Sequence, residues 1–578
     1  SNFISIKLDR EERPDLDSFY MDFVVALNGH GGWPLSLFLL PDKRPFWGGT
    51  FFRSDQFIKI LHYLSEIWSK DRERIELSAS SAFDALSSEG DWEGSVKEDQ
   101  VLIERAVAAT VSRYDHEYGG FGDAPKFPSL SAIKLLLRVG WREKKQELIN
   151  IASHSLKCMI SGGIYDHIEG GLARYSTDRS WMIPHFEKML YDNALLCAAL
   201  SDAFLVSKDP IFSFALEKTL SFIEKRMLGD SGLGISALDA GDVGNEGHYY
   251  GYTEEQLRGV LTPEELSQAK FLFNLSERGN FEGQLNILSL QASDRWIDLQ
   301  SRQSGIIIEK LSQLRSSREH PRIDDKSLVS WNGLLISAFV SGFRALKDPH
   351  YLQRAESIVN FILRNMFVDG ALKRRYREGD VDFDGCLEDY ACFISGLLDL
   401  YSVTANVVYR EVARTILLKA IELFWDEKNH LFFNSHAEDL VIRKQEVLDG
   451  ATPSDNGVML SNLLIISRLD SDLEIKKIAD QLKVAVKKRI DRHEGGGLTT
   501  GISLFDSLYS CAVTIYGEHQ QYLELIEKLN SEYHPGLIFN YSSANNMVGM
   551  ELCCGDVCYA PTSDVSEVLR TLEEYEGR

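Results

Sequence analysis

One stretch of the chain concentrates side chains that can do acid–base chemistry. Between Gly162 and Ala194 the sequence reads GGIYDHIEGGLARYSTDRSWMIPHFEKMLYDNA, with carboxylates, histidines, arginines and tyrosines between glycine pairs. The segments before it (LINIASHSLKCMI) and after it (LLCAALSDAFLV) have the apolar spacing of helices. A polar, glycine-broken run between two helices is typical of a loop that lines a site. The alternative is a long connection that only satisfies buried helix ends.

The polar-then-apolar pattern recurs along the chain, which indicates an internal repeat. The segments YDNALLCAAL, SWNGLLISAF, EDYACFISGLL and SDNGVMLSNLL begin at Tyr191, Ser330, Glu388 and Ser454, and a second amphipathic segment follows each. Adding SLSAIKLLLRVG with QELINIASHSLKCMI, and SLFDSLYSCAVTIYG with QYLELIEKL, gives six helical hairpins. Hairpins that cannot bury their apolar faces alone must stack or close. We therefore expect a mainly α fold, an (α/α)6 six-hairpin barrel. An open solenoid is the alternative.

The inner helices of such a barrel direct their leading ends to one rim, so the polar signatures should meet in a funnel that forms the largest polar pocket. Carboxylates and amides bind hydroxyl groups, and aromatic faces cover a sugar ring. The candidate catalytic residues are His185, Glu187, Asp166, Asp192, Glu388 and Asp389. The candidate ligand-binding residues include Arg174, Tyr175, Trp331, Asn332, Tyr390, Asp449 and Asn456. The alternative is that Asp and Asn at helix starts are N-caps.

Two reactions fit these residue types. Glycoside hydrolysis needs two carboxylates, roughly 6.5–9.5 Å apart for inversion. Epimerisation beside a carbonyl needs a base and an acid, for which histidines suit neutral pH, first His185 and then His167. No other inner-helix signature carries a histidine, which weakens a two-histidine epimerase. His185 follows a proline and precedes a helical pattern, so we expect its imidazole at a positive helix end, in the neutral form.

The first 92 residues predict a different, α/β domain. Phe3–Asp9 reads as a strand, a helix follows Pro14, Leu35–Leu40 and the residues from Pro45 read as a hairpin, and Asp55–Ser69 reads as a helix. This order matches the back half of a thioredoxin fold, and it predicts a cis peptide bond before Pro34. The sequence contains no CxxC motif.

The remaining residues, 93–578, are assigned to the barrel. One insertion, at about 230–318, interrupts the helical repeats with loop and β-like signals. Eight cysteines do not make a disulfide framework in a chain of this length. Cys511 lies in a helical pattern and is expected to be a buried thiol, whereas Cys553, Cys554 and Cys558 cluster without the second ligand pair that zinc would want.

The amino-acid composition limits which classes of partner the protein can bind. The chain has 62 Lys and Arg against 86 Asp and Glu, a formal net charge of −24, which argues against nucleic acid and anionic membranes as partners. No run approaches the roughly 18 apolar residues of a membrane helix, and no signal segment opens the chain. We expect a cytoplasmic protein without a metal or cofactor. The oligomeric state is not predictable from the sequence.

Several of these segments also resemble a known family. Asp166, Arg174–Tyr175, Asp178–Arg179, Trp181 and Pro184–Ala194 resemble the signature of the spermatogenesis-associated protein 20 family, also called the YyaL-type family. Trp181 joins the candidate ligand-binding residues on this basis. Further matches are Lys7–Asp17, Gly31–Phe52, Gly119–Ser129, Asp324–Leu334, Leu387–Ala391 and Asp449–Asn456.

The resemblance spans nearly the whole chain. It implies a thioredoxin-like domain, here partial, joined to a barrel similar to N-acylglucosamine 2-epimerases and six-hairpin glycosidases. Family members carry a CxxC-type motif upstream of KLDREERPD, so no residue of this chain takes over a redox role.

We therefore expect a carbohydrate-active or sugar-binding barrel, epimerase- or glycosidase-like, with a small polyhydroxylated ligand. One alternative is a non-catalytic scaffold that binds a ligand or a protein. Another is a thiol redox protein, if a longer natural chain supplies the missing CxxC.

Overall fold

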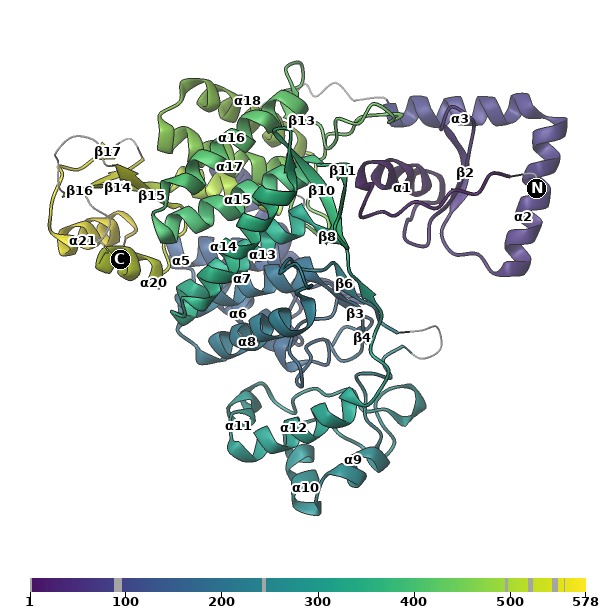
Figure 1. Cartoon of the computed structure of the whole chain (residues 1–578), viewed down its shortest axis with the longest axis horizontal. Helices are drawn as coiled ribbons and strands as arrows, with labels where there is room; N and C mark the ends of the chain where they lie inside the picture. The colour runs from purple at the N-terminus through teal and green to yellow at the C-terminus, as the bar shows by residue number, and fades with distance from the viewer. Residues whose placement is uncertain are drawn as a thin grey trace. The chain divides into compact units, whose positions relative to one another are not determined.

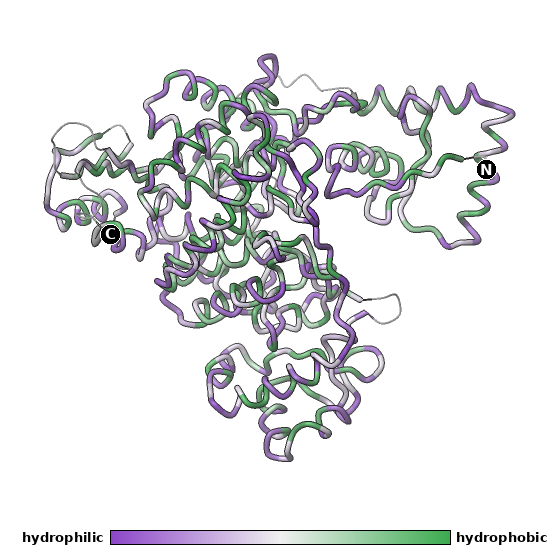
Figure 2. The backbone as a smooth tube through the Cα atoms, in the orientation of Figure 1, coloured by the Kyte–Doolittle hydropathy of each residue, from purple (hydrophilic) through white to green (hydrophobic). Residues whose placement is uncertain are grey.

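The computed structural model describes residues 3–87, 96–241, 246–493, 497–517, 523–542, 549–555 and 557–577. The chain divides into two compact units, Ser1–Ser95 with Glu422–Glu446, and Val96–Ile421 with Val447–Arg578. Helices predominate in both (Figure 1). Hydrophobic and hydrophilic residues alternate along most of these helices (Figure 2), as expected when one face of each is buried.

In the first part of the N-terminal unit, residues 3–87, the structure describes one hairpin and three helices. These are α1 (Pro14–Asn28), β1 (Ser36–Leu39), β2 (Pro45–Gly49), α2 (Ser54–Lys70) and α3 (Arg72–Ser87). The strands pair antiparallel, with Phe38 opposite Trp47. The predicted cis peptide bond between Trp33 and Pro34 is confirmed. The predicted strand at Phe3–Asp9 is wrong, because this segment pairs with no strand among the described residues and Ile4 stays 92% exposed.

A segment far away in the sequence completes this unit. Glu422–Glu446 carries β12 (Trp425–Asp426) and β13 (Leu431–Phe432), which pair antiparallel. Arg13 lies 2.8 Å from the Asp439 carboxylate, and Lys444 lies 2.7 Å from that of Asp22. Charged pairs therefore tie this segment to the first helix, a partnership that the sequence analysis did not anticipate.

Six inner helices close into a ring, which confirms the predicted (α/α)6 barrel. Each helix packs against the next, and the last packs against the first. They are α5 (Leu130–Arg142), α7 (Leu190–Ser207), α13 (Val329–Leu346), α15 (Leu387–Thr404), α17 (Asp455–Asp470) and α19 (Leu498–Leu508). By length and composition α7 could cross a membrane, but 72% of it is buried, as expected for a core helix of the ring.

The outer helices follow the predicted hairpins with one exception. They are α4 (Asp99–Ser112), α6 (Gln146–Ser161), α8 (Pro210–Phe222), α14 (His350–Asn365), α16 (Val407–Phe424) and α18 (Leu473–Ile490). The sixth predicted hairpin is wrong, because α19 packs against α4, which precedes the repeats in sequence. The segment after α19 forms β14 (Cys511–Tyr516) instead, with alternate residues buried.

Short strands run along the barrel rim just before the inner helices. β5 (Lys188–Met189) precedes α7 and pairs with β6 (Ala237–Leu238), which pairs with β7 (Ile323–Asp324). β8 (Ser327–Leu328) precedes α13 and pairs with β10 (Ala371–Arg377). The remaining rim strands are β3 (Tyr175–Ser176), β4 (Pro184–His185), β9 (Phe367–Val368) and β11 (Asp380–Asp384).

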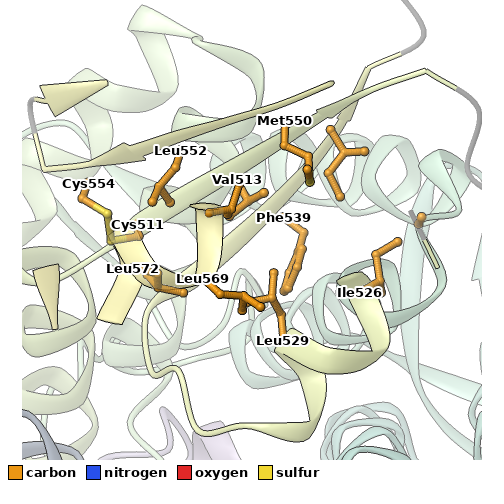
Figure 3. Packing of buried hydrophobic residues seen from close by; sticks show 13 residues of the cluster. Cys511, Val513, Ile526, Leu529, Phe539, Met550, Leu552, Cys554, Leu569 and Leu572 are labelled. Carbon is orange, nitrogen blue, oxygen red and sulfur yellow. A yellow bond between two sulfur atoms is a disulfide. The ribbon is translucent and has the colours of Figure 1, made fainter. Parts of the chain in front are cut away.

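The C-terminal residues form a small α/β layer. The strand order is β15 (Leu537–Ser542), β14, β16 (Gly549–Cys554) and β17 (Val557–Cys558). Val513, Phe539 and Leu552 pack with residues of α20 (Leu523–Ser531) and α21 (Val565–Tyr575) into its core (Figure 3).

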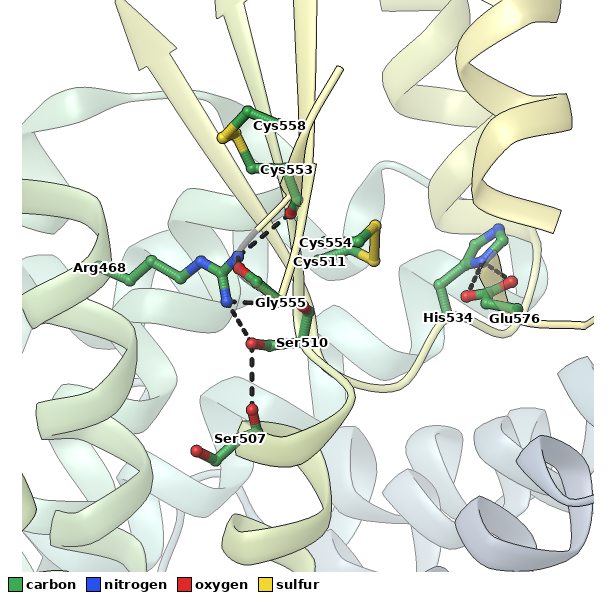
Figure 4. The surroundings of a disulfide bond; sticks show 10 residues. All are labelled: Arg468, Ser507, Ser510, Cys511, His534, Cys553, Cys554, Gly555, Cys558 and Glu576. Carbon is green, nitrogen blue, oxygen red and sulfur yellow. Dashed lines mark hydrogen bonds and ion pairs between the residues drawn. A yellow bond between two sulfur atoms is a disulfide. The ribbon is translucent and has the colours of Figure 1, made fainter. Parts of the chain in front are cut away.

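Four cysteines of this layer form two disulfides between neighbouring strands. Cys511 pairs with Cys554, and Cys553 pairs with Cys558 (Figure 4). The prediction that Cys511 is a buried thiol is therefore wrong. It followed from the helical pattern assigned to this segment, which is a strand.

The insertion is mainly helical, and its β structure is limited to the short strand β6 and isolated bridges such as the one between Tyr252 and Asn286. It contains α9 (Glu254–Val260), α10 (Pro263–Leu272), α11 (Trp296–Leu299), α12 (Arg302–Ser316) and two short 3-10 turns. Thr253 and Thr262 start the first two helices, each in a capping box with a Gln or Glu three residues later. These TEEQ and TPEE motifs are helix-start signals that the sequence analysis did not use.

Close packing of the inner ring generates a first prediction. A Cβ atom on Gly333 of α13 would lie 2.5–2.7 Å from the α15 backbone at Cys392 and Phe393. Gly333→Ala must therefore push two inner helices apart, and we expect it to lower the free energy of unfolding by about 1–3 kcal/mol in chemical denaturation.

The matched control for this substitution is Gly305→Ala in α12. A Cβ atom there would meet nothing within 4 Å. Alanine has the higher helix propensity, so this variant should be neutral or more stable by up to about 1 kcal/mol. Equal effects of the two substitutions would contradict the packing argument.

Candidate functional site

An aromatic platform lies in the loop before α7. β3 pairs with β4 so that Tyr175 lies opposite His185, and their rings stack with centroids 5.1 Å apart. Phe127 packs against Tyr175 at 5.0 Å. The platform is open to solvent in part, because Phe127 is 45% exposed.

Charged side chains surround His185. Its Nδ1 atom lies 2.8 Å from Oε1 of Glu246, and its Nε2 atom lies 3.6 Å from Oε2 of Glu187. The same Glu187 oxygen accepts a hydrogen bond from Arg174 at 3.2 Å. Hydrogen bonding to Glu187 and then to Glu246 outweighs the opposing effect of burial, so the pKa of His185 lies above its ordinary 6.5.

The expected neutral form of His185 is therefore wrong. His185 belongs to β4, and α7 begins only at Leu190, so no helix dipole acts on the imidazole directly. Its closest charged neighbours are carboxylates, which stabilise the imidazolium. The sequence pattern located the residue but not the partner Glu246, which comes from the insertion.

Asp192 differs from the other buried carboxyls of the rim. It lies in the first turn of α7 and is 7% exposed. Its Oδ2 atom is buried and has no hydrogen-bond partner among the described residues. Burial raises the pKa of Asp192 well above its ordinary value, while the charge of Arg174 opposes this shift and that of Glu187 adds to it. The protonated acid is thereby favoured.

Glu187 has the opposite character. Burial alone would raise the pKa of Glu187, but His185 and Arg174 hold it below its ordinary value. Two neighbouring carboxyl groups therefore differ in their preferred protonation state, the arrangement that acid–base catalysis requires. We call Arg174, Tyr175, His185, Glu187 and Asp192 the rim cluster.

Asp166 and His167 lie in the same loop but serve the fold. The Asp166 carboxylate lies 2.8 Å from Lys188 and 2.7 Å from Arg315 of α12. Burial alone would raise the pKa of Asp166, but these two cations hold it below its ordinary value. His167 is buried at 3.1 Å from the Gly162 carbonyl, and burial lowers its pKa to about 4.

Asn332, at the start of α13, hydrogen-bonds backbone groups of a neighbouring loop, and Asn193 makes the same type of contact at the start of α7. The Asn332 amide accepts the Gly234 N–H at 2.7 Å and donates to the Gly234 carbonyl at 3.0 Å and that of Leu328 at 2.9 Å. Asn193 makes the matching bonds to Leu172 at 2.7 and 3.1 Å, and to the carbonyl of Met189 at 2.9 Å.

The candidates of α15 are held by one arginine. Arg374 on β10 lies 2.8 Å from the Asp389 carboxylate and 2.5 Å from that of Glu388. Asp389 also accepts the backbone N–H groups of Ser330 and Cys386. The Tyr390 hydroxyl accepts the N–H of Leu372 at 2.9 Å. These contacts anchor the rim strands to α15.

The other candidates are also buried. Asp449 accepts the N–H groups of Ser454 and Thr499, which joins the starts of α17 and α19. Asn456 is fully buried. The Trp181 ring is buried and donates to the Tyr118 carbonyl at 2.9 Å. Trp331 meets Tyr191 edge-on at 4.9 Å, with only 4% of its surface exposed.

A cavity of about 1,140 Å³ runs inside the ring. All six inner helices and the C-terminal sheet line it. None of the candidate catalytic or ligand-binding residues contributes to its wall, so this cavity is not the one predicted. A second void, about 20 Å³ and therefore the size of one water, lies beside Asp166 and His167.

The sequence analysis missed the charged residues inside the ring. Those on the inner helices are Lys134 and Arg138 of α5, Asp202 of α7, Arg344 of α13, Asp399 of α15, Arg468 of α17 and Asp506 of α19. The available signal was polar spacing of three and four residues on otherwise apolar helices, as in Ser131, Lys134 and Arg138.

Among the described residues, one group has the spacing of metal ligands. Glu551, Cys553 and Cys558 offer ligand atoms within 4.8 Å of one another. Because the two cysteines share a disulfide, neither supplies the thiolate that a metal binds. This donor set does not fit a metal ion.

The comparisons with known sequences concern both units. Residues 1–87 match the family described as "Thioredox_DsbH: Protein of unknown function, DUF255". Human spermatogenesis-associated protein 20 is 34% identical over 531 residues, 80% of this chain and 66% of the relative. An uncharacterised Caenorhabditis elegans protein is 31% identical over 547 residues, 85% and 74% of the two chains. The chain thus spans 66% of the length of the human relative.

Solved structures with similar folds are sugar-converting enzymes by name. A D-mannose isomerase has 12% identity and a TM-score of 0.49, over 73% of this chain and 99% of that one. A cellobiose 2-epimerase from Bacillus thermoamylovorans has 11% identity and a TM-score of 0.44, over 67% and 86%. The barrel assignment rests on the closed ring of inner helices described above.

The pairing of His185 generates a second prediction. Glu246→Gln removes one of its two carboxylate partners, so the pKa of His185 should fall toward 6.5. Because the folded-state pKa is raised, this pairing stabilises the wild type fully below pH 6.5 and ceases to do so as the pH rises through the folded-state pKa. Histidine NMR titration measures the shift.

Buried His167 serves as the internal control in the same spectra. Its pKa should stay near 4 in both proteins. An unchanged His185 titration in Glu246→Gln would show that Glu246 does not pair with it in solution.

Proposed function

The chain belongs to the spermatogenesis-associated protein 20 family, and we propose that its barrel binds and converts a small polyhydroxylated ligand, a sugar or sugar-like carbonyl compound, at the rim cluster. The family relationship supplies the architecture. The chemistry is argued from the rim cluster alone.

The observation that carries the proposal is the contrast between Asp192 and Glu187. Asp192 is buried with an unpartnered oxygen and a raised pKa, so it can donate a proton. Glu187 is kept ionised by Arg174 and His185, so it can accept one. An acid and a base of matched position are the minimum for proton transfer to and from a bound sugar.

The surrounding side chains suit a sugar. The Tyr175 and His185 rings, with Phe127 beside them, offer a flat face for the apolar side of a sugar ring. Arg174 donates to Glu187 and keeps a buried Nε–H without a partner among the described residues. This N–H group is available to orient a ligand oxygen.

Two reactions remain in competition. In epimerisation, Glu187 would remove the proton beside the carbonyl while Asp192 protonates the carbonyl oxygen, giving an enediol. In glycoside hydrolysis, Asp192 would protonate the leaving oxygen while Glu187 activates water or attacks the sugar. A two-histidine epimerase loses support, because His167 is buried and held by the Gly162 carbonyl.

A thiol redox role is the second candidate, and the N-terminal family match favours it. It requires thiols that residues 1–87 lack, because that segment contains no cysteine. A longer natural chain that supplies a CxxC motif would be the protein to test. Reduction of insulin by that longer chain, and not by this one, would support the role.

The third prediction tests the sugar proposal. A panel of monosaccharides and disaccharides is screened by thermal shift, and ligands that bind are incubated in D2O and followed by proton NMR. Loss of the C2 proton signal identifies an epimerase, and release of a new reducing end identifies a hydrolase. Asp192→Asn and Glu187→Gln should each lower the rate by about 10²–10⁴-fold.

These variants separate catalysis from folding. Asp192→Asn removes a buried, unpartnered carboxyl, so its melting temperature should equal or exceed that of the wild type. Asp123→Asn, at a side chain 92% exposed, is the control that should change neither property. Ligand binding without turnover would favour the scaffold alternative. Full activity of Asp192→Asn would remove the proposed acid.

A further inference from the structure

The inner helices direct a polar stripe into the cavity of the ring. On α5 the stripe is Ser131, Lys134 and Arg138, and on α15 it is Ser395, Asp399 and Ser402, all of which line the cavity. Spacings of three and four residues place each set on one helix face. The cavity wall is therefore polar along these two helices, between apolar residues of the other helices.

Arg138 of α5 links three inner helices through two ion pairs inside the ring. It lies 3.0 Å from the Asp506 carboxylate of α19 and 3.3 Å from that of Asp202 of α7. Both carboxylates are thereby engaged. One helical turn earlier on α5, Lys134 lines the same cavity.

Lys134 is the unusual residue of this region. Its side chain has no hydrogen-bond or ion-pair partner within the described part of the chain, and neither has the carboxylate of Asp399. Burial lowers the pKa of Lys134, although Asp202, Asp399 and Asp506 partly offset this shift and Arg138 adds to it. The side chain is half-buried, lines the cavity and has no salt bridge among the described residues.

Hydroxyl groups line the walls around it. Ser131, Ser337, Ser395 and Ser461 face the cavity from four different helices, and their hydroxyls have no partner in the described structure. Polar groups that line such a space without a protein partner are met by water or by a polar ligand. A space of about 1,140 Å³ is large enough for either.

We propose that the lumen of the barrel is a second, covalent binding site, in which Lys134 forms an imine with the carbonyl group of a small polyhydroxylated aldehyde or ketone. The neutral amine attacks the carbonyl carbon, and the oxygen takes up a proton to give a carbinolamine. Loss of water then gives the imine. The step needs no oxidant or reductant.

Asp399 and the serine hydroxyls that line the cavity each have a role in imine formation. Asp399, which has no cationic partner of its own among the described residues, acts through a water in the cavity: it takes each of the two protons that the amine nitrogen loses and passes it to the carbonyl oxygen, the first to form the carbinolamine hydroxyl and the second to release that hydroxyl as water. The serine hydroxyls bind the hydroxyl groups of the ligand. None of these residues belongs to the rim cluster, so the proposal does not depend on the rim chemistry.

The fourth prediction is a trapping experiment. The full chain is incubated with D-glyceraldehyde and sodium cyanoborohydride, which reduces an imine to a stable amine, and peptide mass spectrometry follows each lysine over time. Lys134 should be modified at least about tenfold faster than the exposed lysines, because a larger fraction of its amine is neutral.

Lys347 is the matched reference. It is exposed, and burial of part of its side chain lowers its pKa to about 8, so its amine is also reactive without a cavity. Asp399→Asn lowers the pKa of Lys134 further, but it also removes the group that relays protons to the carbonyl oxygen, so it should slow labelling at Lys134 and leave the rate at Lys347 unchanged. Lys347→Arg should have no effect on Lys134. Asp192→Asn should label Lys134 like the wild type, which separates this test from that of the rim.

Two results would overturn the proposal. One is labelling of Lys134 at or below the rate of the exposed lysines. The other is an Lys134 rate that is the same in Asp399→Asn and in the wild type. Lys134→Arg, which keeps the charge, should remove that adduct and keep the melting temperature within a few degrees, and a fold that collapses there leaves the Asp399→Asn comparison as the deciding measurement.

Discussion

Two buried amides determine where the chain can place chemistry. Asn193 and Asn332 each bind both backbone groups of one loop residue, Leu172 and Gly234 respectively, and also a carbonyl just before their own helix. Buried backbone groups need such partners, because leaving them unsatisfied costs free energy. The hydrogen bonds of Asn193 hold Leu172 against α7. The same loop continues to His185 and Glu187, so their proximity to Asp192 depends on this contact.

Among the buried carboxylates of the rim, the number of hydrogen-bond donors and cations around each one distinguishes structural residues from functional candidates. Asp166 receives two cations, and Asp389 receives one cation and two backbone N–H groups. Both charges are compensated, as a buried carboxylate requires. Asp192 has no such partner at Oδ2, and its pKa is raised. Most polar residues at the helix starts therefore serve structure, because their hydrogen bonds and ion pairs hold the rim segments in place. Asp192, which lacks such a partner at Oδ2, is the functional candidate.

The sequence predicted the barrel well because its signal is repeated. The repeated polar-then-apolar pattern indicated five hairpins correctly, whereas the sixth failed because α4 (Asp99–Ser112), the partner of α19 (Leu498–Leu508), lies far earlier in the sequence. Locally ambiguous segments failed too: CAVTIY was read as helix and the TEEQ and TPEE starts were missed. For the site, residue types located His185, Glu187 and Asp192. The sequence could not reveal Glu246 as a partner, nor that Glu388 and Asp389 share Arg374, because those contacts join distant segments.

The geometry of a six-helix ring explains why the barrel has a polar interior at all. Laterally the helices approach closely, as the α13–α15 contact at Gly333 shows. Axially the ring encloses more space than side chains fill, and an inner helix of 18 residues spans about 27 Å. Small hydroxyl residues and the Arg138 ion pairs make that space compatible with water. Serines and paired charges suffice for this purpose. Lys134 and Asp399 have a different character, because each lines the cavity without an ion-pair partner among the described residues and so ties no helices together, which is the property expected of groups that meet a ligand.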